Sequence, residues 1–195
     1  MLTRSSALAR SITLYEILST VMVSVVLGVF MWGWTLVYDL LKIFLDNTPV
    51  SYFTSGFWLI PGLLIPYIIR KPGLGLLASI VAAFVQGLIT QWGLGALIYG
   101  ILQGVGAEII FLLFNYRRFD RFSLFLAGLA SAFLSYGYDY FKYNYESLGP
   151  VNSSLQLIAF SISSFLFAAL PTIYLANRLK KTGVLNTFLL VKKET

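Results

Sequence analysis

The chain has 195 residues, of which 58% are hydrophobic and only 11% are charged, whereas globular domains usually carry about 25% charged residues. It has a formal net charge of +6 and contains neither histidine nor cysteine. This composition excludes disulfides, thiol chemistry, bis-histidine haem sites and histidine-dependent proteases, and we expect no cofactor and no metal. Since a G-x-x-x-x-G-K-[ST] motif is also missing, we expect neither ATP hydrolysis by this chain nor any enzyme activity.

Six apolar segments divide the chain, at residues 12–35, 53–69, 74–90, 94–114, 122–143 and 154–177. An α-helix needs about 20 apolar residues to cross a bilayer, so six such segments consume most of the chain. The sequence therefore predicts an all-α, polytopic membrane protein with six transmembrane helices and a single domain over residues 1–195. The length of the first segment favours a retained span over a signal peptide.

Basic residues alternate between the gaps that separate these segments. One set of gaps holds twelve of the fourteen: Arg4, Arg10, Arg70, Lys71, Arg117, Arg118, Arg121, Arg178, Lys180, Lys181, Lys192 and Lys193. The other set holds only Lys42 and Lys142. The positive-inside rule therefore predicts a multi-pass protein of the cell membrane with both termini in the cytoplasm.

The first segment carries small residues at every fourth position, namely Thr20, Ser24 and Gly28. Such a strip lets another helix approach closely, either within the chain or on a partner. Residues 36–46 follow with apolar residues at helical spacing. They are expected to form either an interfacial helix over the outer face, which could act as a lid, or an extension of the first span.

The fourth segment, 94–114, is the least like a lipid-exposed helix because it contains Tyr99, Gln103 and Glu108. Polar and ionisable groups within a membrane are costly and are candidates for function. Gln103, near mid-membrane, is expected either to contact a ligand or to join two helices. Glu108 lies nearer the cytoplasm and is expected either to bind a ligand or to bond a neighbouring helix.

The fifth segment places Asp139 among Tyr136, Tyr138 and Tyr140 near its outer end. An aromatic belt at the membrane interface explains some of these tyrosines. An acid surrounded by aromatic rings could also hold a cationic or amine-bearing heterocycle.

Several stretches along the chain form a recognisable set. They are Trp58 with Tyr67–Gly73, then Gln103–Glu108, then Tyr138–Asp139, and finally Thr182–Asn186. In order and spacing they resemble the YkoE-type S components of energy-coupling factor (ECF) vitamin transporters, over nearly the whole chain.

This resemblance implies a substrate-capturing membrane subunit for thiamine, its hydroxymethylpyrimidine precursor or a related vitamin. It also implies two kinds of partner, a transmembrane coupling protein and two cytoplasmic ABC ATPases that drive uptake. The strip of Thr20, Ser24 and Gly28 would then contact the coupling protein. In the family pattern, glutamates align with Tyr52, Ser79 and Gln86, none of which is acidic here.

The expected pocket lies between the outer halves of segments two to six. Aromatic rings would stack on the heterocycle, while amides and acids would bind its edge. The candidate substrate-binding residues are Trp58, Gln86, Trp92, Tyr99, Gln103, Glu108, Tyr136, Asp139 and Tyr140.

Two other classes of function are compatible with the composition. A non-transporting membrane scaffold would use the small-residue contacts alone, but it gains little from polar groups at Gln103 and Glu108. An ion channel is less favoured, because the sequence shows no charged ring or pore motif.

Overall fold

A computed structural model describes residues 11–45, 48 and 50–181, and these residues form helices and turns without a strand. The predicted tail motif 182–186 and the basic residues Arg4, Arg10, Lys192 and Lys193 lie outside the described residues. The elements follow in the order α1 (Leu14–Leu45), η2 (Ser51–Leu59), α2 (Ile60–Ile69), α3 (Leu74–Ile89), η3 (Gly93–Gly95), α4 (Ala96–Leu113), α5 (Arg121–Lys142), η4 (Tyr145–Leu148), α6 (Pro150–Ser164), η5 (Phe165–Ala169) and α7 (Leu170–Lys181). The all-helical prediction is confirmed.

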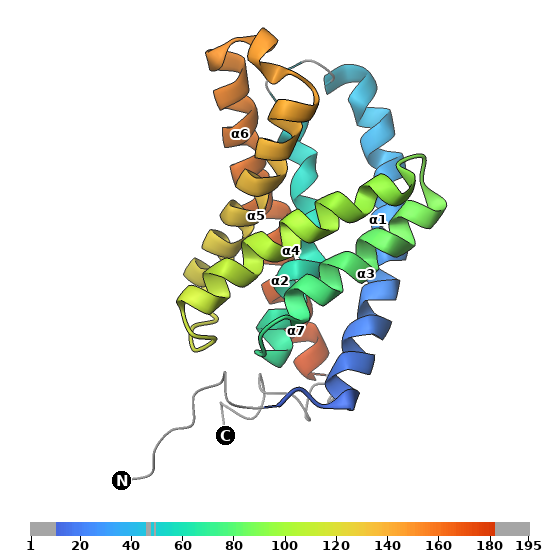
Figure 1. Cartoon of the computed structure of the whole chain (residues 1–195), viewed down its shortest axis with the longest axis vertical. Coiled ribbons are helices and arrows are strands. Elements are labelled where there is room, and N and C mark those ends of the chain that lie inside the picture. The colour runs from blue at the N-terminus through green and yellow to red at the C-terminus, as the bar shows by residue number, and fades with distance from the viewer. Residues whose placement is uncertain (1–10, 46–47, 49, 182–195) are drawn as a thin grey trace.

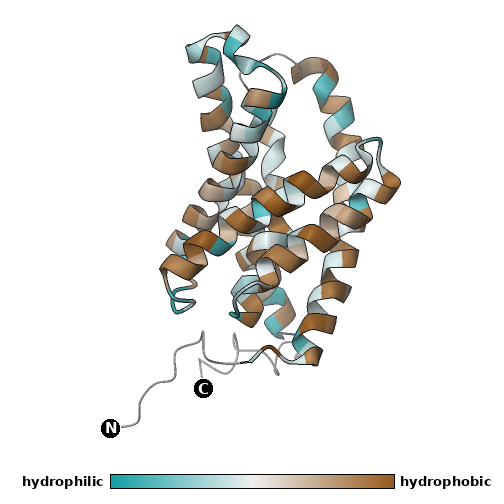
Figure 2. Ribbon diagram, in the orientation of Figure 1, coloured by the Kyte–Doolittle hydropathy of each residue, from teal (hydrophilic) through white to brown (hydrophobic). Residues whose placement is uncertain are grey.

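Short 3-10 or π segments join some of these helices into longer continuous helical segments. In the described chain, four helical segments are long and apolar enough to cross a membrane: Leu14–Leu45, Ser51–Ile69, Gly93–Leu113 and Pro150–Lys181. The apolar helix α3 has only 16 residues, and the 22-residue α5 is not among the four. Hydrophobic residues follow the helices along most of their length, and hydrophilic residues gather near their ends (Figure 2).

Helix α1 is continuous from Leu14 to Leu45. Residues 36–45 therefore extend the first span, and the alternative of a separate interfacial helix is wrong. At 1.5 Å per residue the 32 residues of α1 measure about 48 Å, more than the ~30 Å of a bilayer's hydrocarbon core. The helix runs along one side of the molecule from its lower to its upper end (Figure 1).

Small residues let α1 pack closely on α3. Thr20 and Ser24 are fully buried, and a Cβ added to Gly28 would lie 2.7 Å from the Ala82 carbonyl oxygen and 2.8 Å from Val85 Cβ. The strip of Thr20, Ser24 and Gly28, predicted to contact a partner, is thus covered by the chain itself. The backbone approach that small residues permit is made here by α3.

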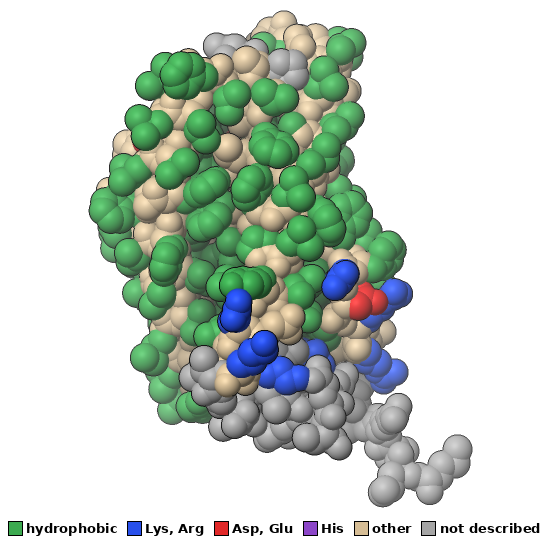
Figure 3. Space-filling view, turned by 180° about the vertical axis from the view of Figure 1, so that it is seen from behind, with side chains coloured by type: hydrophobic (Ala, Val, Ile, Leu, Met, Phe, Trp, Pro, Cys, Tyr) green, Lys and Arg blue, Asp and Glu red, His purple; other side chains and the backbone are tan. Residues whose placement is uncertain are grey.

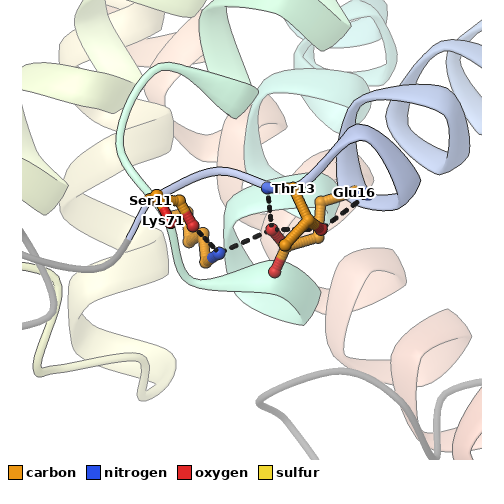
Figure 4. A network of polar contacts seen from close by, with 4 residues as sticks. All are labelled: Ser11, Thr13, Glu16 and Lys71. Atoms are coloured by element: carbon orange, nitrogen blue, oxygen red, sulfur yellow. Dashed lines mark hydrogen bonds and ion pairs between the residues drawn. The ribbon is translucent and has the colours of Figure 1, made fainter.

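An ion-pair network fastens the start of α1 to the turn between α2 and α3 (Figure 4). Lys71, which is 2% exposed, places its Nζ 2.5 Å from Glu16 Oε2 and 2.5 Å from the Ser11 carbonyl oxygen. The same Glu16 oxygen accepts hydrogen bonds from the backbone N–H and the hydroxyl of Thr13. Lys71 is therefore buried with its charge paired, as a lysine in a protein interior requires.

Basic side chains gather at one end of the molecule. On the face shown in Figure 3, lysines and arginines cluster at the lower end, and hydrophobic side chains cover the surface above them. The same end holds the start of α1 and the end of α7 (Figure 1). This separation is what the alternation of basic gaps in the sequence predicts.

Candidate functional site

Two elements bring tyrosine hydroxyls to the carboxylate of Asp139, which lies on α5 and is 6% exposed. The Tyr99 hydroxyl of α4 donates to Oδ1 at 2.5 Å, and the Tyr52 hydroxyl of η2 donates to Oδ2 at 2.8 Å. The Tyr145 hydroxyl of η4 lies 3.2 Å from that of Tyr52. A buried acid must be hydrogen-bonded, and these tyrosines meet that need. We call Asp139, Tyr52, Tyr99 and Tyr145 the Asp139 cluster.

Aromatic rings line the side of the Asp139 cluster that faces α6. Tyr136 packs edge-on against Tyr52, with ring centroids 5.2 Å apart, and lies 6.5 Å from Tyr140. The Tyr136 hydroxyl donates to the Ser153 carbonyl at 2.8 Å and lies 3.2 Å from Gln156 Oε1. Tyr136 is therefore held in place from α6.

A second aromatic group lies between η2 and the C-terminal half of α1. The ring centroids of Trp58 and Trp92 are 5.4 Å apart, and Tyr38 packs edge-on against both. Nearby, Gln86 Nε2 donates to Thr35 Oγ1 at 2.9 Å, which joins α3 to α1. Among the described residues the buried indole Nε1 of Trp58 has no hydrogen-bond partner, so it remains a donor that a ligand could use.

Glu108, expected either to bind a ligand or to bond a neighbouring helix, lies apart from these groups and bonds the start of α3. Its carboxylate accepts hydrogen bonds from the backbone N–H groups of Gly73, Gly75 and Leu76 at 3.0, 2.7 and 3.3 Å, and from the Tyr116 hydroxyl. Those N–H groups begin α3, where a helix end attracts a negative charge. Nine residues along α4 separate Glu108 from Tyr99, about 14 Å of helix.

The predicted residues therefore fall into separate groups. Tyr99, Tyr136, Asp139 and Tyr140 come together, while Trp58, Trp92 and Gln86 lie towards α1. Gln103 is 7% exposed, and its backbone carbonyl accepts a bond from Ser131 Oγ at 2.7 Å, which joins α4 to α5.

Sequence reasoning missed Tyr52 as a site residue. The available signal was its position, because it aligns with a glutamate of the family pattern. In this chain a phenol at that position binds the one carboxylate of the cluster. Tyr145 gave no such signal, since η4 and η2 meet only in the folded chain.

Two hollows lie near these groups. One of about 310 Å³ is lined by Val29, Phe30, Trp32, Gly33, Trp34, Val37 and Phe57. The other, of about 10 Å³, is lined by Tyr38, Leu41, Lys42, Leu45, Ser51 and Thr54. Asp139 lines neither of these two hollows, and its carboxylate is buried beneath the aromatic rings that pack around Tyr52 and Tyr136.

The chemistry of the Asp139 cluster is that of binding. A carboxylate and phenol hydroxyls can accept hydrogen bonds from an amine, and the carboxylate can pair with a cation. Flanking rings can stack on a flat heterocycle. In the part of the chain that the structure describes, no three acidic residues come together as a metal site would require.

Comparisons with known proteins agree on one family. Residues 15–134 match the family described as "ABC-type cobalt transport system, permease component". The chain is 35% identical, over 147 residues and 74% of each protein, to YkoE of Bacillus subtilis (strain 168), whose name marks it as a proposed HMP/thiamine permease. A solved structure titled "Crystal structure of an S-component of ECF transporter" superposes with a TM-score of 0.89 at 32% identity, covering 94% of this chain and 93% of the other. The chain therefore belongs to the YkoE-type S components of ECF transporters, a family of multi-pass proteins of the cell membrane.

Proposed function

We propose that this S component captures thiamine, hydroxymethylpyrimidine or a closely related vitamin from the outer side of the membrane. The observation that carries the proposal is the buried Asp139 carboxylate, held by the Tyr99 and Tyr52 hydroxyls and flanked by further tyrosine rings. An aminopyrimidine presents donors and acceptors on its edge and a flat face for stacking. Both kinds of contact are available in this cluster.

Uptake would need partners that supply energy. Because the sequence has no nucleotide-binding P-loop motif, ATP hydrolysis would come from two cytoplasmic ABC ATPases joined through a transmembrane coupling protein. The small-residue strip of α1 is covered by α3, so the coupling protein would bind another face of this S component.

A cobalt ion is the cargo named in the family description, and the residues favour it less. The sequence contains no histidine and no cysteine, which are ligands that late transition metals prefer. The described residues also gather no group of three acids. A neutral or cationic heterocycle suits a single carboxylate among phenols better.

Intrinsic tryptophan fluorescence of the purified protein, titrated with thiamine, hydroxymethylpyrimidine and unrelated vitamins, tests this proposal. Trp58 and Trp92 lie in contact with each other near the outer end of α1, so a ligand that parts the rings should change their emission. Saturable quenching by one pyrimidine compound at nanomolar to micromolar concentration is the expected result. An equal response to every vitamin, or none, would contradict it. Cobalt(II), added in the same series, tests the ion as cargo.

A further inference from the structure

Three tyrosine rings surround the ammonium group of Lys142, the last residue of α5. Its Nζ lies 5.3 Å from the ring centroid of Tyr99, 5.3 Å from that of Tyr138 and 5.0 Å from that of Tyr143. The Tyr99 and Tyr138 rings stand nearly perpendicular, with centroids 5.5 Å apart. We call Tyr99, Tyr138 and Tyr143 the tyrosine cage.

Rings in this arrangement bind cations, because the negative faces of several aromatic groups converge on one positive charge. Proteins use such cages to bind organic cations that carry no hydrogen-bond donors. A lysine in an exposed position ordinarily keeps its ammonium in water on a flexible stem. Lys142 is exposed, yet its ammonium lies within reach of all three rings.

The tyrosine cage is joined directly to the Asp139 cluster. Tyr99 belongs to both, since its ring faces Lys142 and its hydroxyl donates to Asp139 Oδ1 at 2.5 Å. Lys142 also follows Asp139 by three residues on α5, a spacing that puts both on one face of the helix. A ligand whose amine edge bonded Asp139 could therefore place a cationic group between the rings.

We propose that the tyrosine cage is a subsite for an organic cation, and that the Lys142 ammonium occupies this subsite and competes with a cationic ligand for it. The proposal rests on the proposed function and adds a specificity-determining residue to it. A cationic heterocycle has to displace the lysine ammonium and also meets its charge. A neutral pyrimidine bound at Asp139 meets neither obstacle, so Lys142 biases the site towards neutral ligands.

The test compares three probes on matched variants. Thiamine carries a cationic thiazolium ring, hydroxymethylpyrimidine is neutral, and tetramethylammonium is a cation without a pyrimidine. The variant Lys142→Gln vacates the cage, and Lys142→Gln/Tyr138→Leu also removes one wall. Lys42→Gln is the control, because Lys42 is the other basic residue of the outer gaps and lies outside the cage. Calorimetry gives the affinities for the two vitamins, and ligand-observed NMR gives that for tetramethylammonium.

We expect Lys142→Gln to bind thiamine about 3- to 10-fold more tightly than the unmodified protein and hydroxymethylpyrimidine within about twofold. The gain should vanish with Tyr138→Leu and be absent in Lys42→Gln. Equal changes for both vitamins, or the same gain in Lys42→Gln, would overturn the proposal, since general electrostatics would then explain the effect.

The titration with tetramethylammonium tests the cage independently of the proposed function. If the unmodified protein bound neither vitamin, the proposed function would fail while the cage could still be judged. Saturable binding of tetramethylammonium to Lys142→Gln that is lost with Tyr138→Leu would support the cage. Its absence from Lys142→Gln would overturn it.

Discussion

The carboxylate of Asp139 lies within a cluster of tyrosines contributed by several elements of the fold. Its two oxygens are already bonded to Tyr99 and Tyr52, so the negative charge is fixed in position before a ligand arrives. Preorganised acceptors of this kind give up little freedom on binding. Tyr52 is a neutral phenol at a position that aligns with a glutamate of the family pattern, so Asp139 supplies the carboxylate of this cluster.

Replacing Asp139 by asparagine should therefore discriminate between ligands. We expect Asp139→Asn to weaken thiamine binding by at least about 10-fold, as lost charge-assisted bonds do, and hydroxymethylpyrimidine binding by less. Calorimetric titration of both compounds measures the difference. Glu146→Gln is the control, because Glu146 is an exposed acid of the nearby segment η4. Equal losses for both ligands would remove charge pairing as the role of Asp139.

Glu108 illustrates how a polar residue within a membrane can be structural. Its carboxylate bonds the N–H groups that open α3, so Glu108→Gln should lower stability by about 1–3 kcal/mol while ligand affinity stays unchanged. Thermal unfolding in detergent, together with a ligand titration, checks both parts. A variant that melted normally but bound poorly would place Glu108 in the binding site.

The sequence could predict which residues carry function better than it could predict their partners. Asp139 and Tyr99 stand out as candidates in the sequence because polar groups are rare in apolar segments. The backbone partners of Glu108 lie 32 to 35 residues away in the chain, and the partners of Asp139 up to 87 residues away. Such contacts depend on how the helices cross, which hydropathy does not encode.

Among the elements, α1 also has a contact partner that its sequence does not predict. Its length and small-residue strip are plain from the sequence, but the spacing cannot tell whether the strip meets a helix of this chain or of a partner. In the structure α3 covers it, because Gly28 leaves room for Ala82 and Val85. Gly33, on the same helix, has nothing within 4 Å of the position of a Cβ.

These two glycines allow a matched test of the α1–α3 contact. Alanine is the better helix former, so Gly33→Ala should leave stability unchanged or raise it by up to about 1 kcal/mol. Gly28→Ala forces a methyl group against the Ala82 carbonyl and should lower stability by about 1–3 kcal/mol. Thermal unfolding of the purified variants compares them. If Gly28→Ala melted like Gly33→Ala but blocked uptake in cells, the strip would be a partner surface after all.

At the scale of the whole molecule, the two ends differ in their polar groups. At the basic end, Lys71 with Glu16 and Glu108 with the start of α3 fasten the turn between α2 and α3 from both sides. The other end holds the Asp139 cluster and the tyrosine cage, whose rings come from η2, α4, α5 and the segment after α5. The basic end is thus held by ion pairs and hydrogen bonds, while the opposite end is closed by aromatic packing.

The positive-inside rule predicts the orientation of these ends in the membrane, and labelling can measure it directly. Because the chain has no cysteine, one introduced cysteine reports a single position. Ser147→Cys, in η4, should react with a membrane-impermeant maleimide in intact cells, because it is exposed at the end that holds the Asp139 cluster. Arg117→Cys, exposed between α4 and α5 at the basic end, should react only in inverted vesicles or after permeabilisation. The reverse pattern would place the Asp139 cluster in the cytoplasm, and capture of a vitamin from outside would then be impossible at this site.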